Sequence, residues 1–158
     1  MSTVTVDIDN ACDDEVPDPA SIRNWINAAL ADRKAQAEIS IRFVSTTESA
    51  ALNKQYRNKN IPTNVLSFPA DIPDFVELPL LGDIVICAKV VATEAKEQHK
   101  ILKAHWAHMV IHGTLHLLGY DHLEDSDADI METLETVILA QLGFPSPYQP
   151  LNQETLSK

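Results

Sequence analysis

The sequence predicts an α+β fold in which a small mixed β-sheet packs against helices. Segments with the period-two alternation of β-strands are concentrated in the first half of the chain, whereas helical periodicity dominates the second half. Hydrophobic residues make up 45% and charged residues 22% of the 158 positions, which is the composition of a globular protein. A chain of this length is one domain and can bury a sizeable hydrophobic core.

The first third of the chain predicts two strands with a helix between them. Alternation over Val4–Ile8 indicates the first strand, and alternation over Glu38–Val44 indicates the second. The second strand would place three apolar side chains on one face: Ile39, Ile41 and Phe43. Between the strands, apolar residues recur at helical spacing: Ile22, Trp25, Ile26, Ala29 and Leu30.

The next stretch predicts a helix, two strands and a loop. Ser45–Tyr56 begins with hydroxyl residues and has Glu48 in its first turn, as helix N-termini often do. Its expected apolar stripe is Ala51, Leu52 and Tyr56. Short strands are expected over residues 65–68 and 81–87, and they are joined by a proline-rich acidic connector, residues 69–79.

Three helices are expected in the second half. They span residues 89–98, 102–118 and 125–142, and Gly119 suits the end of the second. The third helix has acids at its N-terminus, as the helix dipole favours. Its expected inward residues are Ile130, Leu134, Val137, Ile138 and Leu142. Residues 1–145 are therefore interpreted as a single domain, and residues 146–158 as a polar, flexible C-terminal tail.

Composition limits the cellular location and the kind of partner. No apolar run is long enough to cross a membrane, and the N-terminus lacks the features of a signal peptide. Two cysteines, Cys12 and Cys87, form neither a disulfide framework nor a metal knuckle, which favours a reducing, cytoplasmic location. The net charge of −11 disfavours general binding to nucleic acid.

The charge is unevenly distributed along the chain. Residues 1–22 contain six acids and no lysine or arginine, and residues 104–158 contain eight acids and a single lysine. Residues 23–103 hold eleven of the twelve basic residues and carry a net charge of +2. A local cationic site for an anionic partner is therefore compatible with the acidic total.

The main functional signal is the histidine-rich segment of residues 112–122, H-G-T-L-H-L-L-G-Y-D-H. His112 and His116 are four residues apart, so they share one face of the predicted helix. A chain reversal at Gly119 can bring His122 to the same point. Three imidazoles with a fourth position left for water are typical of a catalytic zinc site, so the metal site is predicted on the long helix and the following turn.

Two features of this segment leave alternatives open. His108 and His112 are also four residues apart and form a rival metal pair, while His105 and His108 are otherwise expected to pack or to support the site. The spacing matches that of metzincin proteases, but Gly113 replaces their general-base glutamate, which argues against peptide hydrolysis. Gly113 indicates either open space beside the metal or close helix packing.

The histidine motif and two further segments resemble the YbeY family of bacterial endoribonucleases, the rRNA maturation factors. The supporting segments are L-N-K-Q-Y-R-N-K-N-I-P-T-N-V-L-S-F-P at residues 52–69 and L-L-G-D-I-V-I-C at residues 80–87. The similarity runs from about residue 39 to residue 143. Many members have aspartate at the position of Asn64, so no catalytic role is assigned to that residue.

The resemblance implies a zincin-like α+β fold and one divalent metal ion, Zn²⁺ by expectation, on His112, His116 and His122. It implies hydrolase activity as a single-strand-specific endoribonuclease in 16S rRNA 3′-end maturation and ribosome quality control, in the cytoplasm. Arg57 matches the family's functional arginine. Expected partners are single-stranded RNA, rRNA and the ribosome or small-subunit proteins, with no membrane and no DNA.

These residues predict a mechanism in which the metal activates water and Arg57 stabilises charge on the phosphate. The attacking group is either that water or the neighbouring 2′-hydroxyl of the RNA. Two other functions remain open from the sequence. One is a zinc-binding ribosome-assembly factor without catalysis, and the other is a metalloprotease-like hydrolase, which Gly113 disfavours.

Overall fold

The helices and strands expected from the sequence are all present. The computed structural model describes residues 3–33, 36–73, 79–120 and 124–148. The strands are β1 (Thr3–Asn10), β2 (Gln36–Val44), β3 (Val65–Pro69) and β4 (Leu80–Cys87). The helices are α1 (Pro19–Leu30), α2 (Thr46–Arg57), α3 (Ala88–Glu97), α4 (Leu102–Leu117) and α5 (Asp125–Gln141).

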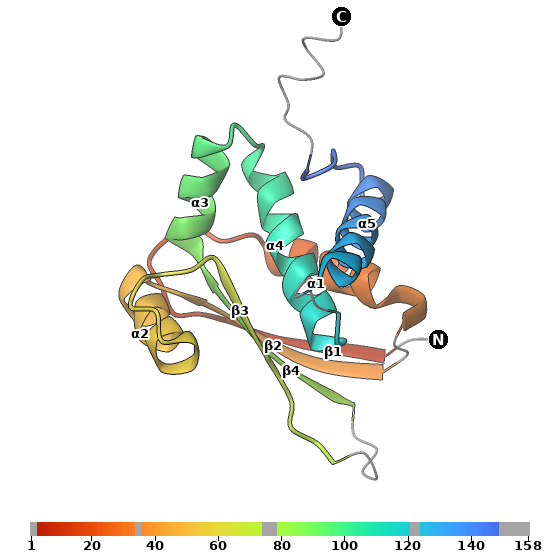
Figure 1. Ribbon diagram of the computed structural model, residues 1–158, viewed down its shortest axis with the longest axis horizontal. Coiled ribbons are helices and arrows are strands. Elements are labelled where there is room, and N and C mark those ends of the chain that lie inside the picture. The colour runs from red at the N-terminus through yellow and green to blue at the C-terminus, as the bar shows by residue number, and fades with distance from the viewer. Residues whose placement is uncertain (1–2, 34–35, 74–78, 121–123, 149–158) are drawn as a thin grey trace, which may run out of the picture.

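The four strands form one mixed sheet in the order β1-β2-β4-β3 (Figure 1). Strands β1, β2 and β4 are parallel, and β3 is antiparallel to β4. The alternation of β2 places Ile39, Ile41 and Phe43 in the core, as predicted. The observed architecture confirms the predicted α+β class and its small mixed sheet.

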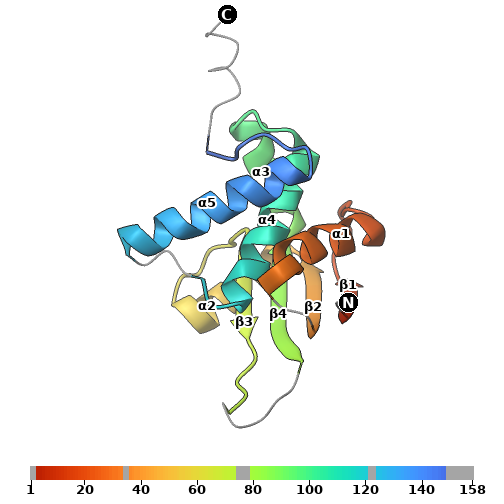
Figure 2. The ribbon, with the colours of Figure 1, turned by 90° about the vertical axis from the view of Figure 1, so that its right-hand side faces the viewer.

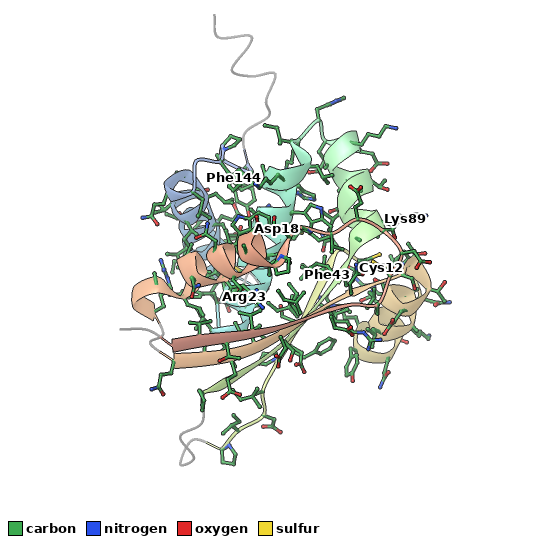
Figure 3. The ribbon with its side chains drawn as sticks, turned by 180° about the vertical axis from the view of Figure 1, so that it is seen from behind. Cys12, Asp18, Arg23, Phe43, Lys89 and Phe144 are labelled. Carbon is green, nitrogen blue, oxygen red and sulfur yellow. The ribbon has the colours of Figure 1, made fainter. Side chains whose placement is uncertain are left out.

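Helix α4 occupies the centre of the helical layer. It lies across β3 and β4, with α1, α3 and α5 around it, while α2 lies apart at one end of the sheet (Figures 1 and 2). From the opposite side, Phe43 points from the sheet toward the helices (Figure 3). Its ring meets that of Trp106 on α4 edge-on, with 5.4 Å between the centroids. Because α4 is surrounded, the histidines on it are held on a rigid element.

Helix α2 buries a polar face, so the apolar stripe expected for it is wrong. Ala51 is exposed, and the side chain of Tyr56 is 58% exposed. The buried side chains are those of Ser49 and Asn53. They hydrogen-bond the carbonyls of Thr63 and Ile61, at 3.0 and 2.9 Å. These bonds fasten the loop after α2 onto the helix, which explains why polar residues are buried there.

Helix α5 is rotated relative to the sequence prediction. Ile138 is buried as expected, but Ile130 and Val137 are 54% and 45% exposed. The buried face is instead formed by Met131, Glu135, Ile138 and Leu139. Glu135 belongs to this buried face. Glutamate is almost always exposed unless it is paired, so the sequence pattern placed Glu135 on the solvent side and predicted the wrong inner face.

The structure describes only parts of the predicted connector, residues 69–79, and of the predicted tail, residues 146–158. The proline-rich connector is described except for residues 74–78, and the predicted tail is described only through Tyr148. The proposed boundary between domain and tail stays a prediction, but Tyr148 donates a hydrogen bond to Glu135 on α5. None of the helices in the described parts of the chain is long and apolar enough to cross a membrane.

Gly82 is expected to be the most sensitive glycine of the sheet. It follows an irregularity in the pairing of β2 with β4, and its φ is +146°. A Cβ atom here would lie 2.4 Å from the backbone oxygen of Phe68 and 2.8 Å from Cδ2 of Leu117. We expect Gly82→Ala to lower the free energy of unfolding by roughly 3 kcal/mol or more in urea titrations, through backbone strain and overpacking.

Gly143→Ala is the matched control for this prediction. Gly143 also has a positive φ, +90°, but a Cβ atom added there would meet no heavy atom within 4 Å beyond its chain neighbours. Its alanine variant should lose only about 1–2 kcal/mol, the cost of the backbone conformation alone. Equal losses in the two variants would contradict a steric role for Gly82.

Candidate metal centre

Four histidines lie along α4 in two environments. His105 and His108 are buried, with 4% and 7% exposed surface, whereas His112 and His116 are half-buried. His112 and His116 line a cleft of about 490 Å³ that also contains Arg57, Asn64 and Tyr120. The structure therefore separates the pair that reaches the cleft from the pair that the helices enclose.

The rings of His112 and His116 converge at their Nε2 atoms. These atoms are 3.1 Å apart, and the ring centroids are 4.6 Å apart. Two nitrogen ligands on one tetrahedral zinc ion, each at about 2.0–2.1 Å, lie about 3.3 Å from one another. The pair therefore has the separation and the chemistry of two ligands of one ion, and it fits a divalent metal.

The predicted third ligand, His122, lies outside the described residues. The turn that leads toward it is described. Gly119 has φ +104° and donates its amide to the carbonyl of His116, while the amide of Tyr120 bonds the carbonyl of Leu115. This is a Schellman motif, so the predicted end of the helix at Gly119 is confirmed.

Glu135 is a site residue that the sequence analysis missed. Its carboxylate is completely buried, and Oε2 accepts a hydrogen bond from Nδ1 of His112. Oε1 contacts Nε2 of His108 at 3.1 Å and accepts a hydrogen bond from the hydroxyl of Tyr148. The available signal was its position on the buried face of α5, four residues after Met131 and four before Leu139.

The electrostatics of this cluster keep Glu135 ionised. Burial alone would raise the pKa of Glu135, but hydrogen bonds from His108 and His112 outweigh burial and hold the pKa far below its usual value. Burial lowers the pKa of His108, so its ring is neutral. Burial and the bond to Glu135 raise the pKa of Tyr148 well above its usual value, so its hydroxyl remains a donor.

A second donor set overlaps the first. His108, His112 and Glu135 offer ligand atoms that all lie within 4.8 Å of one another, so this group could also hold a metal ion. The rival pair considered from the sequence, His108 and His112, is therefore brought together as well. His112 belongs to both sets.

His105 belongs to a separate hydrogen-bonded network. Its Nε2 lies 2.9 Å from Oε1 of Glu94, and the side-chain amide of Asn64 donates to both oxygens of the same carboxylate, at 3.1 and 3.2 Å. Burial would raise the pKa of Glu94, but these partners lower it. Asn64 thus ties the start of β3 to α3.

Gly113 permits close packing rather than open space beside the metal. A Cβ at this position would lie 3.0 Å from Cγ2 of Ile84 and 3.3 Å from Cγ2 of Val65. The hydroxyl of Ser67 also donates to the carbonyl of Gly113 at 3.0 Å. The packing alternative is therefore the correct one, and α4 can approach β3 and β4 because this residue has no side chain.

Comparison with known proteins agrees with the motifs. The family model described as "Endoribonuclease YbeY" matches residues 7–143. The chain belongs to the YbeY family. The resemblance inferred from the histidine motif and its two companion segments is therefore confirmed.

Several YbeY relatives align over most of the chain. Proteins named "Endoribonuclease YbeY" from Cellvibrio japonicus and Pseudomonas putida are 54% and 53% identical, over 94% and 96% of this chain and 85% and 98% of their own lengths. The one from Pseudomonas entomophila is 56% identical over 90% of this chain and 92% of its own. A solution structure from Thermotoga maritima has a TM-score of 0.62 at 24% identity, covers 97% of this chain and 93% of its own, and supports the fold.

Proposed function

We propose that this YbeY protein is a metal-dependent, single-strand-specific endoribonuclease that acts in the cytoplasm in 16S rRNA 3′-end maturation and ribosome quality control. Family membership supports cleavage of RNA. The observation that carries the proposal is the convergence of the His112 and His116 Nε2 atoms in a cleft that Arg57 also lines. His112, His116 and His122 would hold the ion, and Zn²⁺ suits a set of three imidazoles.

A bound divalent ion supplies activation of the attacking oxygen and neutralises charge on the scissile phosphate. The chain's own residues orient the substrate around it. Arg57 lies at the last turn of α2, where its guanidinium can pair with two nonbridging phosphate oxygens. The half-buried histidines leave one side of the site open to the cleft, so the RNA backbone can enter.

The protease alternative is not favoured by the geometry around residue 113. The Cβ of a residue there would lie 3.0 Å from Cγ2 of Ile84 and 3.3 Å from both Oγ of Ser67 and Cγ2 of Val65. A glutamate at that position would therefore be crowded by these side chains, which would have to shift. Peptide hydrolysis by a general base at 113, as in metzincins, is therefore disfavoured on packing grounds.

The acidic surface supports a limited mode of RNA binding. The net charge is −11, and the basic residues are concentrated in residues 23–103. Repulsion by the remaining surface would weaken binding to random RNA, so we propose that the ribosome or a small-subunit protein delivers the substrate. Strong, salt-sensitive binding of random RNA would contradict this part of the proposal.

Metal removal tests the proposed activity directly. We expect the purified protein to cleave a defined single-stranded RNA and to spare the same sequence in a duplex. Chelation should abolish cleavage, and added Zn²⁺ should restore it, because the phosphate charge is otherwise uncompensated. Equal cleavage in the metal-free and metal-loaded states would contradict the proposal. A 2′,3′-cyclic phosphate on the product would identify the 2′-hydroxyl as nucleophile.

A further inference from the structure

Glu135 is exceptional in its burial. Among the residues that the structure describes, it is the only acidic side chain in the buried class, and its exposed fraction is 0%. A buried carboxylate is costly unless hydrogen-bond donors surround it. Three donors from two parts of the chain meet it: His108 and His112 on α4, and Tyr148 beyond α5. This arrangement needs an explanation beyond packing.

We propose that Glu135 is a positioning residue that fixes the ring of His112 for metal binding. The proposal rests on the metal site of the proposed function. Oε2 of Glu135 contacts Nδ1 of His112, and a carboxylate oxygen accepts hydrogen bonds, so this Nδ1 atom carries the hydrogen. In the neutral ring Nε2 is then unprotonated, and this is the atom that lies 3.1 Å from Nε2 of His116. Glu135 thereby selects the tautomer whose lone pair faces the cleft.

The other carboxylate oxygen keeps Glu135 in place. Oε1 receives Nε2–H of His108 at 3.1 Å and the hydroxyl of Tyr148. Tyr148 lies thirteen residues after Glu135, so the segment after α5 turns back over the cluster. Because both oxygens are occupied, rotation of the carboxylate away from His112 would break hydrogen bonds that water cannot replace at a buried site.

The same contacts argue against Glu135 as a metal ligand. The alternative set of His108, His112 and Glu135 is closely spaced. However, His108 and Glu135 are enclosed, and neither lines the cleft that His112, His116 and Arg57 share. An ion bound between them would have no open coordination position facing the substrate, which a catalytic metal requires. Glu135 therefore acts through His112.

The tautomer of His112 in the metal-free protein provides a test that does not depend on RNA cleavage. Long-range ¹H–¹⁵N correlation spectra distinguish protonated from unprotonated ring nitrogens. We expect Nδ1–H and unprotonated Nε2 for His112 in the wild-type protein, and a mixture of both tautomers in Glu135→Met, which fills the space without an acceptor. In Glu135→Gln, the Nδ1–H tautomer of His112 should be more populated than in Glu135→Met, since the amide oxygen of glutamine can accept a hydrogen bond from Nδ1–H.

Zinc affinity, measured by competition with a chromogenic chelator, provides the second readout. We expect Zn²⁺ binding to weaken 10- to 100-fold in Glu135→Met and by a smaller factor in Glu135→Gln, as loss of a ligand's hydrogen-bond partner does at other metal sites. Glu132→Met is the matched control, because Glu132 is an exposed glutamate on the same helix. Its affinity and His112 tautomer should equal those of the wild type.

Variants of His108 and His116 distinguish the two alternative sets of metal ligands. His108→Ala should still bind one Zn²⁺, whereas His116→Ala should not. Loss of zinc in His108→Ala with retention in His116→Ala would make Glu135 and His108 ligands and overturn the proposal. If Glu135→Met does not fold, Glu135→Gln decides: a wild-type tautomer together with wild-type zinc affinity would also overturn it. A protein that binds zinc as expected but fails to cleave RNA would contradict only the proposed function.

Discussion

His116→Ala is expected to abolish zinc binding and RNA cleavage together. Its Nε2 lies 3.1 Å from Nε2 of His112, so the substitution removes one of two converging nitrogens in the cleft. His116 is half-buried in the last turn of α4, and a change there leaves the central packing of the helix in place. Metal analysis of the purified variant should find no bound zinc, and cleavage of single-stranded RNA should fall to the level of a buffer control.

A control variant, His99→Asn, purified in parallel, distinguishes the activity of this site from that of a contaminating nuclease. His99 is exposed just after the end of α3, is not among the residues that line the cleft, and has a φ of +56°. Asparagine tolerates that backbone conformation, so His99→Asn removes an imidazole without straining the chain. This variant should retain both zinc and cleavage. Wild-type cleavage by metal-free His116→Ala would show that the activity does not come from this site.

Local periodicity was sufficient to predict the elements and the histidine pair. Alternation in β2 is set by the pleat, and the convergence of His112 and His116 follows from their spacing of four on one helix. Gly119 could be read as a helix terminus because its positive φ suits a residue without Cβ. Each of these inferences depends on residues that are close in sequence.

The supporting residues could not be predicted in this way. Glu135 lies 23 positions after His112, and Tyr148 lies 40 after His108, so no local pattern links them. Burial of Glu135 also made the inner face of α5 hard to predict, because a glutamate in a sequence is normally interpreted as exposed. Similarly, Ser49 and Asn53 are buried to hold a loop, and their partners lie beyond the helix itself. Polar residues in a core derive their stability from long-range partners.

Arg57→Ala is expected to lower kcat for RNA cleavage by about 10²–10³-fold while leaving the fold and zinc content unchanged. Loss of a single preorganised group that stabilises transition-state charge costs enzymes about this factor. Arg57 is exposed at the end of α2 and lines the cleft beside His112 and His116. Exposed substitutions usually change stability by no more than about 0.5 kcal/mol, so thermal unfolding should match the wild type.

Two further variants decide whether the guanidinium itself is responsible. Arg57→Lys keeps the charge but cannot pair bidentately with phosphate, so its turnover should lie between those of the alanine variant and the wild type. Arg23→Ala removes the same charge from α1, where Arg23 is exposed (Figure 3). Because Arg23 is not among the residues lining the cleft, wild-type turnover is expected for this control. Equal slowing by Arg23→Ala and Arg57→Ala would indicate a general charge effect, and unchanged turnover in Arg57→Ala would remove Arg57 from the mechanism.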